Sequence, residues 1–239
     1  ITSNVPSSFT WTASDNANTN GESTSTQNTS LINDNIIHAQ ATAQNVFYTI
    51  TPTTTIGNCL GTAQTLTVTV NPTPVVDALS NPAANCAGQT VNAFTFTTSP
   101  AGAAANWINN NTNTGLAANG TGSPINGFTA NNVTSQEISV VSLTPTLGAC
   151  AGATSSYTLT INPNPMLTIG ALDILNPSAC GNNDGHILGF SVIGAPTIQY
   201  SWNNGAYTSL DLNNLVAGTY NLLATDGNGC AVDTSLTLS

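Results

Sequence analysis

Two segments of the chain repeat one pattern, and this repeat constrains the fold more than any other feature. Residues 58–74 read NCLGTAQTLTVTVNPTP, and residues 149–165 read ACAGATSSYTLTINPNP. In each segment a cysteine precedes an Asn-Pro pair by twelve residues, and Thr or Ser alternates with Leu, Val, Ile or Tyr in between. Alternation with a period of two predicts a β-strand with one buried face. The chain therefore contains at least two copies of one β-module.

The features around these segments occur in the same order in both copies. A tryptophan, Trp11 or Trp107, precedes a stretch rich in Gly, Asn, Ser and Thr, then a strand ending in Thr-Pro, and then the cysteine. The two cysteines, Cys59 and Cys150, lie 91 residues apart. A repeat of this length is typical of an immunoglobulin-like sandwich of about 100 residues. A third pair, Trp202 and Cys230, marks a variant of the module near the C-terminal end.

We therefore predict an all-β chain of tandem immunoglobulin-like β-sandwich modules arranged as a rod. Two or three domains are expected for 239 residues. No segment shows helix caps and a 3.6-residue period. The Asn-Pro-x-Pro segments are predicted to be stiff connectors between modules. The predicted modules are residues 1–72, which lack their N-terminal strands, 73–164, which form a complete module, and 165–239.

Each module has a cysteine just before its final strand, and its partner is expected near the start of the same module. Cys86 and Cys180 follow similar Asn-Pro segments at that place. We predict the pairs Cys86 with Cys150 and Cys180 with Cys230, although sequence alone leaves other pairings open. Cys59 has no partner within the chain, because the strand that would hold it lies before residue 1; a buried free thiol is the alternative. Disulfides would indicate an oxidising compartment.

Charged residues are almost absent. The chain has ten acidic residues and no Lys or Arg, giving a net charge of −10, whereas soluble proteins average about 25% charged residues. The surface must be solvated through Thr, Ser, Asn, Gln and Gly. Without a cation to bind phosphate, nucleic acid and anionic membrane surfaces are excluded as partners. No apolar run approaches the roughly 18 residues of a membrane span, so we expect no membrane insertion.

The repeats resemble known families. The region from NPTPVVDALSNPAANCAGQTV through NWINNN, GLAANGTGS and SLTPT to CAGATSSYTLTINPNP is similar to the PKD-like immunoglobulin repeats of very large surface proteins of gliding bacteria. The N-terminal region resembles the later part of the same repeat. The C-terminal region, with CGNNDGHI, YSWNNG and LVAGTYNLLATDGNGC, resembles the SprB-type repeat of gliding-motility adhesins. Its strand HILGFSV departs from that repeat's Thr-Val alternation, which leaves the strand register open.

The resemblance implies a non-catalytic, structural or adhesive segment of a large bacterial surface filament or gliding adhesin, exported by the type IX route. Neighbouring modules or subunits of the same filament, surface glycans and solid substrata are the implied partners. The first module would be completed by upstream sequence or by another subunit, through its exposed sheet edge.

Few residues could support catalysis or metal binding. His38 and His186 are the only side chains expected to titrate near neutral pH, and no Gly-x-Ser-x-Gly elbow is present. We therefore predict no enzyme; a second possibility is that the chain accompanies a hydrolase encoded outside it. Asp184 and Asp226 could offer oxygen ligands to Ca²⁺. Turn formation explains the same residues without an ion, and no EF-hand spacing is present.

The alternative function is a carbohydrate-binding module, assisted by calcium, in which a tryptophan is exposed for sugar stacking. The tryptophans recur at one place in each module, which favours a role in core packing instead. We predict that Trp11, Trp107 and Trp202 are core residues.

Overall fold

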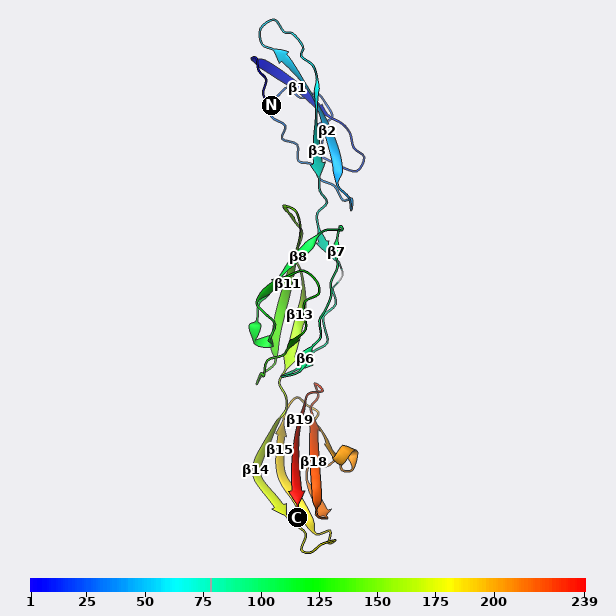
Figure 1. Ribbon diagram of the computed structural model, residues 1–239, viewed down its shortest axis with the longest axis vertical. Coiled ribbons are helices and arrows are strands. Elements are labelled where there is room, and N and C mark those ends of the chain that lie inside the picture. Colours follow the sequence, from blue (N-terminus) through cyan, green and yellow to red (C-terminus); the bar gives the residue numbers. More distant parts are fainter. Residues whose placement is uncertain (78) are drawn as a thin grey trace. The chain divides into compact units, whose positions relative to one another are not determined.

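The computed structural model describes residues 1–77 and 79–239 (Figure 1). Within these residues the regular structure is β-strand apart from two 3₁₀ turns, η1 (Thr112–Thr114) and η2 (Asn203–Gly205). The chain is all-β with immunoglobulin-like sandwich architecture, which confirms the predicted fold class. No helix in the described part is long and apolar enough to cross a membrane.

The chain forms two compact units. The first comprises Ile1–Ala78, Phe96–Asn106 and Leu143–Ser155, and the second comprises Leu79–Thr95, Trp107–Ser142 and Ser156–Ser239. Both units take residues from the predicted module 73–164, and the module boundaries stay a prediction.

The N-terminal residues form an antiparallel sheet with strand order β1-β2-β3. Its strands are β1 (Ser7–Ala13), β2 (Gln44–Thr54) and β3 (Gln64–Val70). Alternate residues point to one face, where Trp11, Ala13, Val46 and Tyr48 are buried. The Trp11 and Tyr48 rings meet edge to face at 5.7 Å. A short ladder pairs β4 (Val75–Val76) with β7 (Thr98–Ser99).

The central six-stranded sheet has the order β5-β13-β11-β8-β9, with β12 paired to β11. The strands are β5 (Asn85–Cys86), β8 (Ala104–Asn109), β9 (Asn119–Thr121), β11 (Glu137–Leu147), β12 (Cys150–Ala151) and β13 (Ser155–Asn162). A two-stranded ladder joins β6 (Thr90–Val91) to β10 (Phe128–Thr129). Strand β13 carries the second copy of the repeated segment, and its alternate residues Tyr157, Leu159 and Ile161 are buried.

The C-terminal residues form two three-stranded sheets with the orders β14-β15-β17 and β16-β18-β19 (Figure 1). The strands are β14 (Met166–Leu175), β15 (Gly185–Ile193), β16 (Gln199–Trp202), β17 (Leu212–Leu215), β18 (Gly218–Thr225) and β19 (Ala231–Leu238). Side chains from both sheets form one buried cluster: Ile187, Phe190, Trp202, Leu212, Leu215, Tyr220, Leu222 and Leu238. This arrangement is a β-sandwich.

The predicted disulfide pairs are wrong. Cys86 is bonded to Cys230, with their Cα atoms 5.5 Å apart. Cys59, Cys150 and Cys180 are free, and Cys59 is exposed, which excludes the alternative of a buried thiol. The bond therefore joins residues that the sequence analysis assigned to separate modules.

Strand geometry explains why Cys86 does not reach Cys150. Strand β5 runs parallel to β13, with Cys86 opposite Asn162 at the strand's C-terminal end. Cys150 precedes Ser155, where β13 begins. The eight residues of β13 span roughly 26 Å, whereas a disulfide needs Cα atoms within about 7 Å.

The same geometry separates Cys180 from Cys230. Cys230 directly precedes the start of β19, whereas the far end of β19 lies beside Asn176, whose Oδ1 accepts a 2.9 Å hydrogen bond from the Ser239 N–H. Cys180 lies four residues beyond Asn176. The two cysteines therefore lie at opposite ends of β19. A cysteine before the final strand was expected to face the module start, but here it faces the neighbouring sheet.

Candidate functional site

A turn between β18 and β19, anchored by a buried aspartate, holds the disulfide in place. Asp226 is 6% exposed. Its Oδ1 accepts hydrogen bonds from the N–H groups of Asn228 (2.9 Å) and Cys230 (3.0 Å), and its Oδ2 accepts one from Ala195 (3.2 Å). These bonds fix the backbone of Cys230, which is bonded to Cys86.

A cavity of about 830 Å³ opens beside this turn. Its volume lies within the range of roughly 300–1,000 Å³ found for small-molecule sites. The chain has no Lys or Arg, so the cavity offers no cation to an anionic ligand. Its lining is largely apolar and includes Val133, Pro163, Pro165, Met166, Ile193 and Val232.

The two candidate calcium residues lie at opposite ends of β15. Asp184 directly precedes the strand and accepts a 2.9 Å hydrogen bond from the Ser178 N–H. Hydrogen bonds from Ser178 lower the pKa of the Asp184 carboxyl. Asp226 bonds to Ala195, beyond the other end of β15. One ion cannot bind both carboxylates, and no group of three or more His, Cys, Asp or Glu side chains occurs among the described residues. Calcium binding at either turn stays a prediction.

All three tryptophans are buried, with exposed fractions of 3% for Trp11, 7% for Trp107 and 0% for Trp202. Trp107 packs directly on Gly120 of β9, where a side chain would collide with the indole ring. None of the three presents a ring face to solvent, so the structure gives no sugar-stacking platform of the kind that the carbohydrate-binding alternative requires.

A second polar cluster lies on the N-terminal sheet and was missed by the sequence analysis. The Asp34 carboxylate accepts hydrogen bonds from the Ser23 N–H (2.9 Å), the Ser23 hydroxyl (2.7 Å) and the Tyr48 hydroxyl (3.0 Å). Desolvation raises the Asp34 pKa, but these hydrogen bonds outweigh it and hold the pKa below its usual value. Burial, together with the Asp34 contact, raises the pKa of Tyr48 to about 12.

His38 does not join this cluster. Its Nδ1 accepts a hydrogen bond from the Gln40 N–H, so its Nε2–H donates to the Val70 carbonyl at 3.0 Å. The carboxylate of Asp34 is occupied by Ser23 and Tyr48 instead. A Ser/His/Asp constellation is therefore not assembled around His38.

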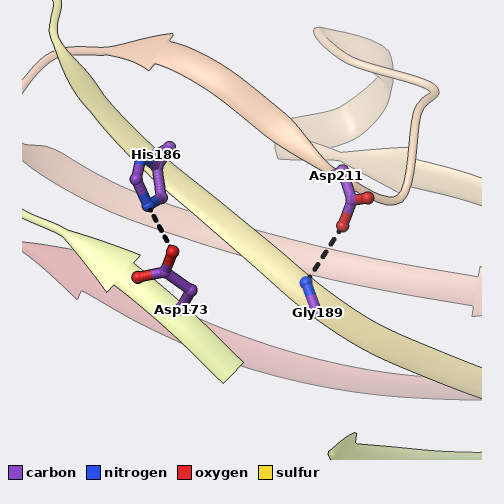
Figure 2. Close-up of polar contacts among 4 residues, drawn as sticks. All are labelled: Asp173, His186, Gly189 and Asp211. Carbon is purple, nitrogen blue, oxygen red and sulfur yellow. Dashed lines mark hydrogen bonds and ion pairs between the residues drawn. The ribbon is translucent and has the colours of Figure 1, made fainter. Parts of the chain in front are cut away.

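The other histidine contacts a carboxylate on the neighbouring strand. Figure 2 shows His186 on β15 turned toward Asp173 on β14, with Nε2 3.1 Å from Asp173 Oδ2. On the same strand, the Gly189 N–H donates a 3.1 Å hydrogen bond to Asp211 (Figure 2). Gly189 has a φ of +90°, a conformation that favours glycine. These contacts hold β15 to the segments on both sides of it.

Sheets that each bury a tryptophan define this molecule as an all-β protein. Residues 1–74 match the family described as the PKD-like domain. No curated protein matches the chain.

Several solved structures of modular proteins are similar. The eight N-terminal immunoglobulin domains of Down syndrome cell adhesion molecule align over 85% of this chain, at 12% identity and a TM-score of 0.42. The chain spans about a third (32%) of that structure's length. A variant of titin domains I67–I69 aligns over 98% of this chain and 88% of its own, at 12% identity and a TM-score of 0.42. Mouse cadherin-23 EC22–24 aligns over 96% of this chain and 84% of its own, at 11% identity and a TM-score of 0.30.

Proposed function

We propose that the chain is a non-catalytic, structural and adhesive segment of a large extracellular surface protein. The observation that carries this proposal is the Cys86–Cys230 bond, which covalently links the central sheet to the C-terminal sandwich. A disulfide persists in oxidising compartments outside the cytosol. A cross-link between consecutive sheets suits a protein that must resist extension.

The finer proposal is a segment of a bacterial gliding adhesin or surface filament, exported by the type IX route. It is supported by the PKD-like match over residues 1–74 and by the resemblance of residues 165–239 to the SprB-type repeat. In such a filament the modules would contact neighbouring modules or subunits.

Adhesion would use the outer face of the β1-β2-β3 sheet. Cross-strand pairs on this face bring threonines together in rows across the sheet, such as Thr12, Thr49 and Thr65. The hydroxyl face carries no charge, and it suits many weak hydrogen bonds to glycans or solid surfaces, with avidity arising from repetition. The threonines of this face are Thr10, Thr12, Thr49, Thr51, Thr53, Thr65, Thr67 and Thr69.

Single-molecule pulling from the two ends tests the structural role. The bonded cysteines are 144 residues apart, so the intact bond should hide roughly 50 nm of contour length, which a reductant releases. The matched variant Cys230→Ser should give the longer extension without reductant. Equal contour lengths in the presence and absence of reductant would count against a cross-link that resists extension.

Adsorption to polysaccharide-coated and bare glass surfaces tests the adhesive role. The double variant Thr49→Glu, Thr51→Glu places charge on the hydroxyl face and should reduce adsorption. The double variant Ser235→Glu, Thr237→Glu adds the same charge at two exposed positions of β19 and serves as the matched control. Equal losses from both changes would contradict adhesion through the N-terminal sheet.

A further inference from the structure

Strands β3 and β13 carry the two copies of the repeated segment, yet their outer edges differ. The outer edge of β13 is paired in parallel with β5, so that Ile161 lies opposite Asn85 and Asn162 lies opposite Cys86. Strand β3 lies at the edge of its sheet, and within residues 1–77 and 79–239 it pairs with β2 alone. The same sequence pattern therefore has a partner in one place and lacks one in the other.

Hydrogen bonds define how the β13 edge is covered. The Asn162 carbonyl accepts a 2.8 Å bond from the Ala87 N–H. The Thr158 N–H donates a 2.9 Å bond to Asn81 Oδ1. At the 91-residue offset, Thr67 corresponds to Thr158 and Asn71 corresponds to Asn162. Residues 81–87 thus lie along β13. In the N-terminal copy, Phe47 lies opposite Thr67 and its carbonyl accepts a bond from Ser14 on the β1 side, so the Thr67 N–H faces the outer edge of β3.

The apolar side chains show the same difference. Tyr157 is 3% exposed, and its ring meets Phe94 edge to face at 5.0 Å. Its counterpart at the 91-residue offset, Leu66, is 45% exposed although it points to the core face beside Tyr48. Val68 is partly buried, whereas its counterpart Leu159 is fully buried. Residues 79–96 thus provide a cover in the central copy that Leu66 lacks.

The other neighbours in the central sheet do have counterparts in the N-terminal sheet. The order β13-β11-β8 corresponds to β3-β2-β1. Strand β9 pairs with β8, which holds Trp107, and an isolated bridge likewise joins Gln27 to Trp11 on β1. Among the described residues, the component without a counterpart is the segment that contains β5 and β6.

We propose that the outer edge of β3, together with Leu66 and Val68, binds an extended uncharged strand of the type of residues 79–96, supplied by another repeat of this kind. The strand would add in parallel, as β5 adds to β13, by β-augmentation. Edge strands are usually protected by Lys, Pro or inward charges, and the segment QTLTVTV contains none of them. This pairing goes beyond the proposed surface role and does not depend on adhesion to glycans or solids.

Binding of a labelled peptide to the full 239-residue chain tests the proposal. The peptide has the sequence of residues 79–96 with Ser in place of Cys86, and fluorescence anisotropy measures its dissociation constant. We expect saturable binding, and Leu66→Thr should weaken it about tenfold, because the bound strand would no longer bury the leucine side chain. Phe47→Thr is the matched control, since Phe47 is also 45% exposed but points to the opposite face.

Hydrogen exchange of the unaltered chain gives a second readout that needs no variant. The peptide should slow amide exchange in residues 64–71 and leave β1 unchanged. Failure to saturate, equal binding of a scrambled peptide, equal losses from the two variants, or protection outside β3 would each overturn the proposal. Self-association of the chain through β3 without peptide would also overturn it, because a second copy of β3 would then be the occupant. The structural role would survive any of these results, since it is tested by pulling.

Discussion

The N-terminal sheet and the C-terminal sandwich each bury a tryptophan, but irregular chain packs over the first and a second sheet packs over the other. The Trp11 indole N–H donates to the Thr29 carbonyl at 3.1 Å, and the Trp202 indole N–H donates to the Ser209 carbonyl at 3.0 Å. Trp11 shares its buried cluster with three residues, and irregular chain that includes Ile32 and Ile36 packs on it. Trp202 belongs to a buried cluster of eight residues drawn from two sheets. Equal burial of one side chain therefore does not imply equal support around it.

Truncation of the two tryptophans should show this difference most strongly. Trp202→Ala should destabilise the C-terminal sandwich by about 3–5 kcal/mol, because a rigid core cannot collapse around the cavity. Trp11→Ala should cost about 1–2 kcal/mol less, since its surroundings can relax. Region-resolved hydrogen exchange is the suitable measurement, because a chain with several units need not unfold in one step. Equal costs would show that the irregular cover is as rigid as a second sheet.

Loss of the disulfide should affect the C-terminal sandwich and leave the N-terminal sheet unchanged. Cys230→Ser should destabilise the C-terminal sandwich by about 2–4 kcal/mol, the range typical of a disulfide. The N-terminal sheet should keep its exchange rates, because neither Cys86 nor Cys230 belongs to it. Cys180→Ser removes a free, exposed thiol and is the control. Loss of protection in β1 to β3 would show that the sheets are coupled.

Strand alternation was the part of this fold that the sequence predicted well. The alternating patterns that follow Cys59 and Cys150 fall within strands β3 and β13. A period of two is a local property, and these strands are long enough to display it.

The disulfide and the covering segments could not be predicted for a physical reason. Strand β5 has only two residues, too few to show a period, and its parallel pairing depends on chain remote in sequence. The prediction assumed that each disulfide forms within one module, and it therefore gave the wrong partners for Cys86 and Cys230. The Asp34 cluster likewise joins residues on an irregular segment to β2, and sequence spacing carries no signal for such contacts.

Removal of the Tyr48 hydroxyl is expected to have a smaller effect, confined to the N-terminal sheet. Tyr48→Phe keeps the ring packed on Trp11 but removes the bond to Asp34, which should cost about 1 kcal/mol. Because the folded-state pKa of Tyr48 is about 12 and the unfolded value is about 10, the native hydroxyl stabilises below pH 10 and this contribution is lost as the pH rises toward 12. The variant should therefore lack this alkaline step in hydrogen-exchange or fluorescence measurements. If Tyr48→Phe kept the same alkaline loss of stability, another titratable group would be its cause.

Acid titration of Asp34 should give the smallest effect. Its folded-state pKa lies below the usual value because Ser23 and Tyr48 donate hydrogen bonds to the carboxylate. This contribution is present above the unfolded pKa of about 4 and is lost as the pH falls through the folded value. Solvent screening should limit it to less than about 1 kcal/mol.

Asp34→Asn should remove this acid step from β1 to β3, whereas Asp173→Asn, whose carboxylate is exposed on β14, should leave it unchanged. The C-terminal core cluster contains only apolar and aromatic side chains, so its protection should not follow the Asp34 titration. If both regions lost protection over the same pH range in the wild-type chain and in Asp34→Asn, general charge effects would explain the acid response. The Asp34 cluster would then not distinguish the N-terminal sheet from the C-terminal sandwich.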